Sequence, residues 1–262
     1  MLTVLETIQN SWGYWLALSY FAAYPIVTSI MWMITSLFFR VRWEKNQPSP
    51  LLTAFPKVSV LVPAHNEAQM IGSALQAAVA IDYPDFEIVV VDDGSTDQTR
   101  AIVESYVVKG QVRLILKSQN EGKAMALNDA LPCLNGEIIL IMDADAEPEP
   151  DILRHLLPHF EHARVAAVTG NPRVKNVDTF LARLQLIEFS SIVSLLRRSQ
   201  RIWGRIMTVS GVVAAFRKSA LLDVGGFSPE MPTEDIELTW KLQKRFWDVR
   251  YEPRAIVWMT VP

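Results

Sequence analysis

The sequence predicts an α/β fold with a mostly parallel sheet, covered by helices and preceded by one membrane-spanning helix. From Lys57 onward, apolar runs alternate with amphipathic stretches at the spacing of repeated strand–helix–strand units. The apolar runs are continuous, which is typical of strands buried on both faces of a parallel sheet. An uncharged stretch lies near the N-terminus. These patterns predict a transmembrane segment at 1–44, a linker at 45–56 and one globular domain at 57–262.

The composition excludes several classes of protein. Half of the 262 residues are apolar, so the chain can bury a substantial core. The formal net charge of -3 gives no basic footprint, and no nucleic-acid partner is expected. No GxGxxG follows the first strand and no GxxxxGK(S/T) occurs, so dinucleotide oxidoreductases and P-loop enzymes lose their main support. Cys133 is the only cysteine, and its place in the helix–strand pattern favours a buried structural thiol over a nucleophile.

The uncharged stretch at 12–39 predicts a transmembrane helix, because it exceeds the roughly 20 residues that a helix needs to cross a bilayer. A signal peptide is disfavoured, since no basic region precedes the stretch and it is longer than a typical h-region. Arg40, Arg42 and Lys45 follow it, whereas Glu6 is the only charge before it. The positive-inside rule therefore places the rest of the chain in the cytoplasm.

The elements of the predicted domain follow a proline-rich linker in order. Strands are expected at 58–62, 87–91, 112–116, 137–142 and 165–169, and helices at 70–80, 98–107 and 123–131. A basic amphipathic stretch at 178–203 fits either a solvated helix or a helix on a membrane surface. A strand, a short helix and a glycine-rich turn are expected within 207–227, and a further helix begins near Thr233.

Acidic residues follow two of these strands directly. Asp92 and Asp93 come after the strand at 87–91, and Asp143 and Asp145 come after the strand at 137–142. In open parallel sheets ligands bind outside the carboxyl ends of the strands, so both pairs are expected in one crevice. Asp143 and Asp145 form a D-x-D motif, whose carboxylates could hold Mg²⁺ or Mn²⁺ against a diphosphate. One aspartate of the other pair could bind a nucleobase or ribose, although a capping loop without a ligand has the same pattern.

Four more polar residues are candidates for the same region. Glu67 follows the first strand as a third acidic side chain, while His65 by itself is more typical of a surface histidine. Lys123 begins a helix and could neutralise phosphate or be solvated. Glu234 and Asp235 also begin a helix, where the dipole favours carboxylates. By themselves they indicate helix-terminal charge, although an ionised carboxylate could act as a general base.

The segments PAHNE, DDGST, NEGKAMALN, DADA and TED, in this order on such a chain, together resemble the family 2 glycosyltransferases with the GT-A fold. The resemblance extends from Lys57 to the last residue. Four further segments are similar to the branch of this family that makes β-1,6-linked N-acetylglucosamine polymer in bacterial biofilms. They are TGNPRV (169–174), EFSSIVSLLRRSQR (188–201), TVSGVVAAFRKSAL (208–221) and YEPRAIVW (251–258).

The resemblance implies roles for the candidate residues. Asp235 would be the catalytic base, with Glu234 beside it, and Asp143 and Asp145 would hold the metal, Asp143 also contacting the nucleotide sugar. Asp93 would bind uracil or ribose. The remaining substrate-binding residues would line the nucleotide pocket (Pro63, Ala64, His65, Glu67), lie near the diphosphate (Lys123) and border the acceptor sugar (Ser210, Gly211).

The resemblance also implies an activity. A membrane-bound inverting glycosyltransferase would polymerise N-acetylglucosamine from UDP-GlcNAc onto a growing polysaccharide, with its catalytic domain on the cytoplasmic side of a bacterial inner membrane. The bilayer and other membrane subunits of a synthase complex would be its partners. Processive members carry a Q-x-x-R-W motif and further membrane helices, which are absent from these 262 residues, so the chain is expected to be a C-terminally truncated fragment. The alternatives are a hyaluronan, chitin or cellulose type of synthase, or a nucleotide-sugar-binding module without turnover.

Overall fold

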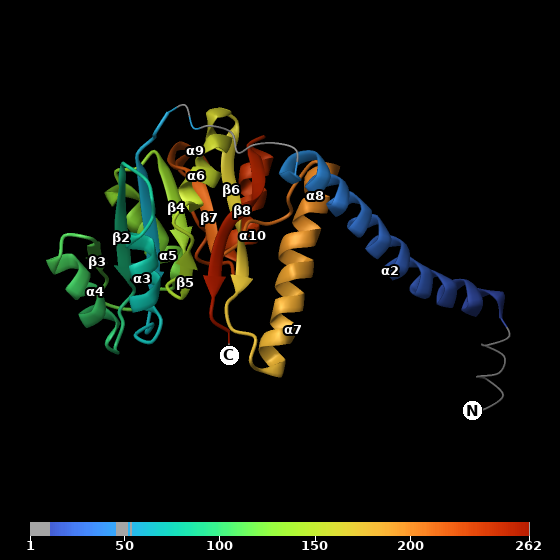
Figure 1. The fold of residues 1–262 in the computed structure, drawn as a ribbon, viewed down its shortest axis with the longest axis horizontal. Coiled ribbons are helices and arrows are strands. Elements are labelled where there is room, and N and C mark those ends of the chain that lie inside the picture. The colour runs from blue at the N-terminus through green and yellow to red at the C-terminus, as the bar shows by residue number, and fades with distance from the viewer. Residues whose placement is uncertain (1–10, 46–51, 53, 262) are drawn as a thin grey trace.

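The computed structural model describes residues 11–45, 52 and 54–261, and most of the predicted linker at 45–56 lies outside them. The described residues form one mixed sheet and a long N-terminal helix that points away from it (Figure 1). The strands are β1 (Val58–Ala64), β2 (Phe86–Asp92), β3 (Arg113–Leu116), β4 (Ile138–Met142), β5 (Ala146–Pro148), β6 (Val165–Val174), β7 (Val213–Arg217) and β8 (Asp248–Met259). Their order across the sheet is β3-β2-β1-β4-β7-β6-β8-β5.

The predicted parallel sheet is confirmed in the half formed by β1 to β4. There, β1 pairs in parallel with β2 and β4, and β2 pairs in parallel with β3. In the other half β7 is antiparallel to both of its neighbours, so β6 runs in the same direction as β4. β8 is parallel to β6, and the short β5 is antiparallel to β8. The carboxyl ends of β1, β2, β4, β6 and β8 therefore share one edge of the sheet.

Helices cover both faces of the sheet. The helical segments are α2 (Trp12–Phe39) with its π-helical extension η1 (Arg40–Lys45), α3 (Ile71–Val79), α4 (Thr99–Val108), α5 (Lys123–Ala130), η2 (Leu131–Cys133), α6 (Ile152–Leu156), η3 (Leu157–Glu161), α7 (Phe180–Glu188), η4 (Phe189–Leu196), α8 (Arg197–Trp203), α9 (Lys218–Asp223) and α10 (Glu234–Lys244). Val60 and Val62 of β1 belong to one core with α3, whereas Leu61 belongs to a second core with α5 and α10. Successive side chains of a strand point to opposite faces, so a continuous apolar run fills both cores.

Four features differ from the sequence prediction, three of them elements and one the cysteine. β5, α6 and β8 were not predicted. β5 and β8 contain prolines, and β8 also has alternating charged residues, which are untypical of a central strand. α6 is only five residues long. The charges of β8 are compensated locally by ion pairs between Arg250 and Asp248 and between Arg254 and Glu252. The prediction of a buried Cys133 was wrong. Its thiol is exposed, because the chain leaves the core at η2 before it enters β4.

The predicted N-terminal helix is present as α2. Within the described residues, one helix, Trp12–Lys45, is long and apolar enough to cross a membrane, and its most apolar window is not buried against the rest of the structure. Its C-terminal part contacts α8 and η4. There the hydroxyl groups of Thr35 and Ser199 share a 2.7 Å hydrogen bond, and Arg198 pairs with Glu44 at 2.5 Å.

Candidate active site

A cleft of about 380 Å³ lies at the carboxyl ends of β1, β2 and β4. Its position is the one expected for a ligand site in an open α/β sheet. The cleft brings together both acidic loops of the sequence prediction and the polar residues after the first strand. The predicted residues that line it are Pro63, Ala64, His65, Glu67, Asp93, Lys123, Asp143 and Asp145, and the lining also includes Asn120, Gly122, Ala126 and Ala144.

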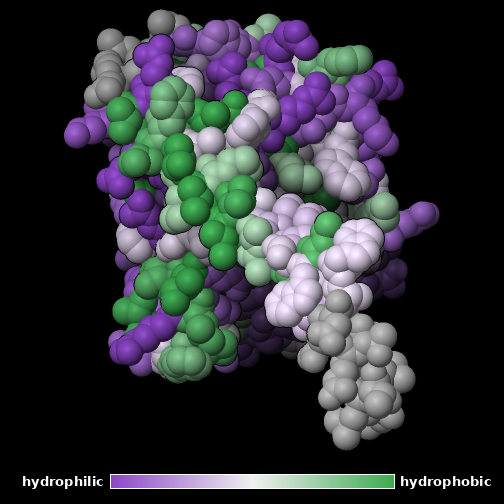
Figure 2. All heavy atoms as spheres, turned by 90° about the vertical axis from the view of Figure 1, so that its right-hand side faces the viewer, coloured by the Kyte–Doolittle hydropathy of each residue, from purple (hydrophilic) through white to green (hydrophobic). Residues whose placement is uncertain are grey.

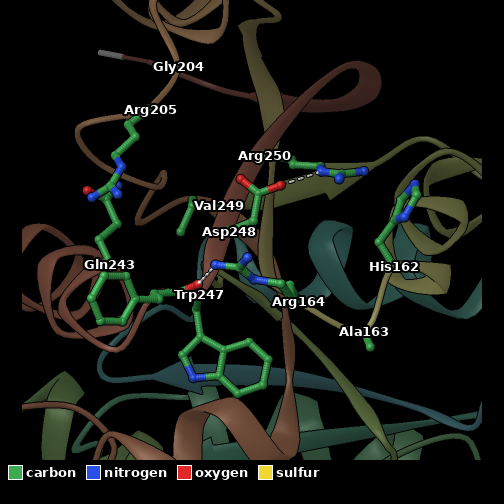
Figure 3. Close-up of a pocket in the computed structure, with 11 residues that line it drawn as sticks. His162, Ala163, Arg164, Gly204, Arg205, Gln243, Trp247, Asp248, Val249 and Arg250 are labelled. Atoms are coloured by element: carbon green, nitrogen blue, oxygen red, sulfur yellow. Dashed lines mark hydrogen bonds and ion pairs between the residues drawn. The ribbon is translucent and has the colours of Figure 1, made fainter.

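A cleft of about 440 Å³ lies at the first residues of β8 and contains none of the predicted site residues (Figure 3). β8 and β6 begin at the edge opposite to the one where β4 ends, so this cleft is remote from the D-x-D motif. Two of its arginines are already engaged within the protein. Arg250 pairs with Asp248 at 2.8 Å, and Arg164 donates to the carbonyl of Phe246 at 3.0 Å.

The two aspartates of the first acidic loop, Asp92 and Asp93, have different roles. Asp92 is buried, and its Oδ1 accepts the backbone N–H of Ser95 at 2.9 Å, which is the capping role that the sequence left open. Asp93 is also buried, but it lines the cleft. Its two carboxylate oxygens accept the N–H groups of Glu121 at 3.1 Å and Gly122 at 2.8 Å. Asp93 therefore ties the second strand to the loop that leads into α5.

Lys117 forms an ion pair with Asp93 and was not among the residues predicted from the sequence. Its Nζ lies 3.3 Å from Asp93 Oδ1, 2.8 Å from Glu121 and 2.9 Å from Asp129. Burial disfavours its charge, but the close carboxylates of Glu121, Asp129 and Asp93 outweigh burial and raise the pKa of Lys117. A charged lysine at this position neutralises the acidic loop. No sequence motif marks it, because its partners lie on separate segments.

His65 is held in place by contacts at both of its ring nitrogens. Its Nδ1 lies 2.8 Å from the carbonyl oxygen of Asp93, and its Nε2 lies 3.1 Å from the side-chain amide nitrogen of Asn66. A carbonyl needs a donor and an amide N–H needs an acceptor, so Nδ1 carries the proton and Nε2 is the acceptor. His65 is thus a fixed, half-buried part of the cleft lining.

Three carboxylates, Glu67, Asp143 and Asp145, line the cleft. Burial raises the pKa of Asp145, and the negative charge of Asp143 adds to this effect. Burial likewise raises the pKa of Glu67, with further contributions from Asp145 and Asp143. These three groups repel one another and lack a full complement of positive charge. The cleft is therefore an acidic site that favours a cation.

The donor set fits a hard divalent cation. Carboxylate oxygens are the ligands of Mg²⁺ and Mn²⁺, and Mg²⁺ is commonly held by one or two carboxylates together with substrate phosphates and water. Among the described residues no cluster of three His, Cys, Asp or Glu side chains is arranged for a metal ion. A cation held by Asp143 and Asp145 would thus need ligand oxygens from the substrate as well.

Lys123 connects the D-x-D motif to the TED segment. Its Nζ donates to Asp143 Oδ1 at 2.5 Å and to the carbonyl of Gly211 at 3.2 Å, and it lies 3.9 Å from Glu234 Oε1. A small cavity on this side is lined by Lys123, Ser210, Gly211, Glu234 and Asp235. The structure thus places the predicted acceptor residues directly beside the predicted nucleotide cleft, with one lysine shared by both.

Two buried threonines fix the acceptor side. Ser210 donates its backbone N–H to Thr169 Oγ1 at 2.8 Å, and Val209 donates to Thr239 Oγ1 at 3.0 Å. The Thr239 hydroxyl in turn donates to the carbonyl of Asp235 at 2.7 Å. The loop before β7 is therefore pinned to β6 and to α10, which carries the base candidate. Neither threonine was singled out from the sequence, although Thr169 lies in the segment TGNPRV that carried the resemblance.

Residues 59–225 match the sequence profile of the family described as Glycosyl transferase family 2. The poly-beta-1,6-N-acetyl-D-glucosamine synthase of Staphylococcus epidermidis is 36% identical over 245 residues, which are 91% of this chain and 60% of that protein. The protein of the same name from Staphylococcus aureus (strain COL) is 34% identical with the same coverage. The chain thus spans about 60% of the length of these curated relatives.

Solved structures show the same fold. The mannosyltransferase PcManGT from Pyrobaculum calidifontis, in complex with GDP-Man and Mn²⁺, superposes with a TM-score of 0.70 and 27% identity, covering 90% of this chain and 68% of that one. TarS 1–349 of S. aureus in complex with UDP-GlcNAc gives a TM-score of 0.58 with 22% identity, covering 79% and 59%. The match to the family over most of the chain and the agreement in fold lead to one conclusion: the chain belongs to glycosyl transferase family 2 and has the GT-A fold.

Proposed function

We propose that this chain is the catalytic part of a membrane-bound, inverting glycosyltransferase that polymerises N-acetylglucosamine from UDP-GlcNAc into a β-1,6-linked exopolysaccharide. The observation that carries the proposal is the contact of Lys123 with both Asp143 and Gly211, because it joins the acidic cleft to a cavity lined by Glu234 and Asp235, as a site for donor and acceptor would require. The donor and the linkage are inferred from relatives at 34% to 36% identity that are named for this product.

Asp235 is the group that would take the acceptor proton. It lies in the first turn of α10, and its Oδ1 accepts the N–H of Ile236 at 2.8 Å. Oδ2 faces Gly211, with 3.5 Å to the place where a Cβ would stand. The acceptor 6-oxygen gives its proton to Asp235 and bonds to the anomeric carbon, while the bond from that carbon to UDP breaks. Attack opposite the leaving group converts the α-linked donor into a β-linked product.

The donor side would be organised by the cleft residues. Asp93 keeps acceptor capacity for a ribose or uracil beyond its three contacts within the protein, and Pro63, Ala64, His65 and Glu67 form the adjoining wall. Lys123 can neutralise diphosphate charge from its position beside Asp143. Asp143 and Asp145 would hold Mg²⁺ or Mn²⁺, which when bound stabilises negative charge on the leaving diphosphate.

The chain would sit in the bacterial inner membrane through its N-terminal helix. We place the transmembrane segment at 1–44, the linker at 45–56 and the catalytic domain at 57–262 in the cytoplasm. The length and exposure of Trp12–Lys45 support this, as do Arg40, Arg42 and Lys45 at its C-terminal end. The growing polysaccharide, the lipid bilayer and other membrane subunits of a synthase complex are the partners that this location implies.

Competition binding tests the donor and the pocket together. The full chain in detergent, with Mn²⁺, is titrated with labelled UDP-GlcNAc against unlabelled UDP-GlcNAc, UDP-glucose, UDP-glucuronate and GDP-mannose. UDP-GlcNAc should compete most strongly, and Asp145→Ala should abolish the metal-dependent part of binding while the fold is retained. Preference for UDP-glucose would indicate a cellulose type of synthase, and an unchanged Mn²⁺ dependence in Asp145→Ala would remove the metal role. Binding without release of UDP would favour a nucleotide-sugar-binding module.

A further inference from the structure

The cleft at the first residues of β8 is rich in positive charge. Its lining includes the guanidinium groups of Arg164, which directly precedes β6, Arg205, which follows α8, and Arg250 of β8. Among the described residues of this lining, Asp248 carries the one carboxylate. At about 440 Å³ the cleft has the size of a small-molecule site. It therefore has room for a ligand and carries more positive than negative charge.

Asp248 does not neutralise this charge, because two arginines already share it. Its Oδ2 lies 2.8 Å from Nε of Arg250, and its Oδ1 lies 3.5 Å from Nη1 of Arg201 on α8. Burial lowers the pKa of Arg201, and the positive charge of Arg250 lowers this pKa further, although Asp248 acts in the opposite direction. The cations at this edge of the sheet thus repel one another, as they would at a site for an anion.

Arg164 and Arg205 are not neutralised by a carboxylate of the described residues. Arg164 donates to an uncharged group, the carbonyl oxygen of Phe246, at 3.0 Å. Arg205 is exposed, and its side chain makes no hydrogen bond or ion pair within the part of the chain that the structure describes. In Figure 3 Arg205 lies on one side of the cleft, and Arg164 and Arg250 lie on the other. Guanidinium groups on both sides can donate to one anion between them, and a phosphate group offers the several oxygens that such donors need.

Phe246, between α10 and β8, provides an apolar surface beside these arginines. Its backbone N–H donates to the carbonyl of Gln243 at 3.0 Å, and the N–H of Trp247 donates to that of Leu242 at 3.1 Å, a pattern that ends a helix with a left-handed residue. Glycine is usual at this position, yet Phe246 occupies it with a φ of 62° and is 73% exposed. A bulky residue in the left-handed region is strained, and such residues cluster at ligand sites. Because Phe246 lines the cleft, the uncharged part of a ligand can lie against its ring.

We propose that this cleft binds a phosphate-bearing anion, at a site separate from the D-x-D cleft. The two clefts lie at opposite edges of the sheet and have opposite charge. The carboxylates of the D-x-D cleft need a cation before a phosphate can approach them, whereas arginines bind phosphate directly. Binding at the arginine-lined cleft therefore needs no metal ion.

The position of the cleft indicates a polar ligand. Figure 2 looks onto the side of the molecule where α2 and α7 expose apolar side chains, and none of those that are described lines the cleft. Two sources carry a phosphate group of this kind, a soluble phosphate compound and the headgroup of an anionic lipid.

Metal-free binding of pyrophosphate tests the site without any use of catalysis. The full chain in neutral detergent, with EDTA and at constant ionic strength, is titrated with pyrophosphate in a calorimeter. Arg205→Gln removes an exposed charge without breaking a contact to any described residue, so the domain should fold normally, and Arg205→Lys keeps the charge. Arg164→Gln probes the other side of the cleft. The matched control is Arg173→Gln, because Arg173 is also exposed but lies near the other end of β6.

We expect pyrophosphate to bind without metal, and Arg205→Gln and Arg164→Gln each to weaken this binding by about tenfold, since a hydrogen bond between charged groups contributes at least that much. Arg205→Lys should lose less, and Arg173→Gln should lose nothing. Absence of binding without metal would overturn the proposal. Equal weakening by Arg205→Gln and Arg173→Gln would also overturn it, because the anion would then respond only to the overall charge of the domain.

Two further titrations identify the source of the phosphate. Tighter binding of UDP than of pyrophosphate in EDTA, lost in Arg205→Gln, would support the site with a soluble nucleotide as its ligand. Pyrophosphate binding that is blocked in nanodiscs of phosphatidylglycerol but retained in nanodiscs of phosphatidylcholine would support the site with a lipid headgroup as its ligand. These results do not depend on transfer of sugar, so the proposed function can fail while this site stands.

Discussion

Lys117→Met removes the cation that stands behind the nucleotide cleft. Methionine keeps most of the length of the side chain, so the change takes away charge with little change in volume. Lys117 pairs with three carboxylates, of which Glu121 and Asp129 are exposed and Asp93 is only 4% exposed. Exposed carboxylates regain water when a partner is lost, so they contribute little to the energetic effect. The effect therefore falls on Asp93.

The expected magnitude follows from the surroundings of Asp93. Breaking a buried ion pair by removing one partner costs about 3–5 kcal/mol, because the remaining charge is left uncompensated. Asp93 keeps two backbone N–H donors, from Glu121 and Gly122, which offset part of that loss. We therefore expect Lys117→Met to lower the free energy of unfolding by about 3 kcal/mol, the lower end of this range. UDP affinity should fall too, since Asp93 and its loop line the cleft.

Urea unfolding in detergent at neutral pH measures the effect, with calorimetry for UDP. Arg100→Met is the matched control, because Arg100 and Glu104 form an exposed i,i+4 pair at 2.7 Å that should contribute no more than about 0.5 kcal/mol. A loss in Lys117→Met of less than about 1 kcal/mol, or equal to that of the control, would refute the argument that a buried charge at Asp93 depends on Lys117.

Two further changes probe the proposed base, Asp235, and a buried ion pair at Glu252. Asp235→Asn keeps shape but removes the proton acceptor, so UDP release from UDP-GlcNAc should fall by roughly 10²-fold or more while donor binding persists. Near-normal turnover in Asp235→Asn would show that another group takes the proton. Burial opposes the charge of Glu252, but hydrogen bonds from Arg254 and His159 outweigh burial and lower the pKa of Glu252 to about 2. A lowered pKa means that the ionised carboxylate stabilises the folded state, here by about 3 kcal/mol. This stabilisation is present above pH 4.5 and is lost as the pH falls toward 2. In Glu252→Gln unfolding free energy should drop at pH 7 and depend less on pH in that window; an unchanged acid limb would contradict the assignment.

The regular half of the fold was predictable because its physics is local. Each of β1, β2 and β4 is buried on both faces, and this requires a continuous apolar run that the sequence displays. β8 is equally buried for much of its length, yet Glu252 sits in it at 3% exposure. Its charge is tolerated because Arg254 and His159 compensate it, and His159 comes from a segment far away in the sequence. Pairing of this kind leaves no periodic pattern to detect.

The site was predictable to the extent that strand ends carry it. Asp93, Asp143 and Asp145 follow apolar runs, and a shared sheet edge brings them together. Lys117, Thr169 and Thr239 were not predictable in this way, because their function is to hold a neighbour across the fold. An isolated lysine or threonine in a strand or helix is common, and its partner is defined only by the tertiary structure.

Lys123 shows why the motifs indicate more together than singly. Its ammonium group contacts the D-x-D motif, the backbone at Gly211 and, at 3.9 Å, Glu234 of the TED segment. These three segments are far apart in sequence, and each alone also fits a charged loop or a helix end. In the folded domain, the single ammonium group of Lys123 lies between the carboxylates of Asp143 and Glu234. A diphosphate entering beside Asp143 would bring the same lysine a stronger, multiply charged partner.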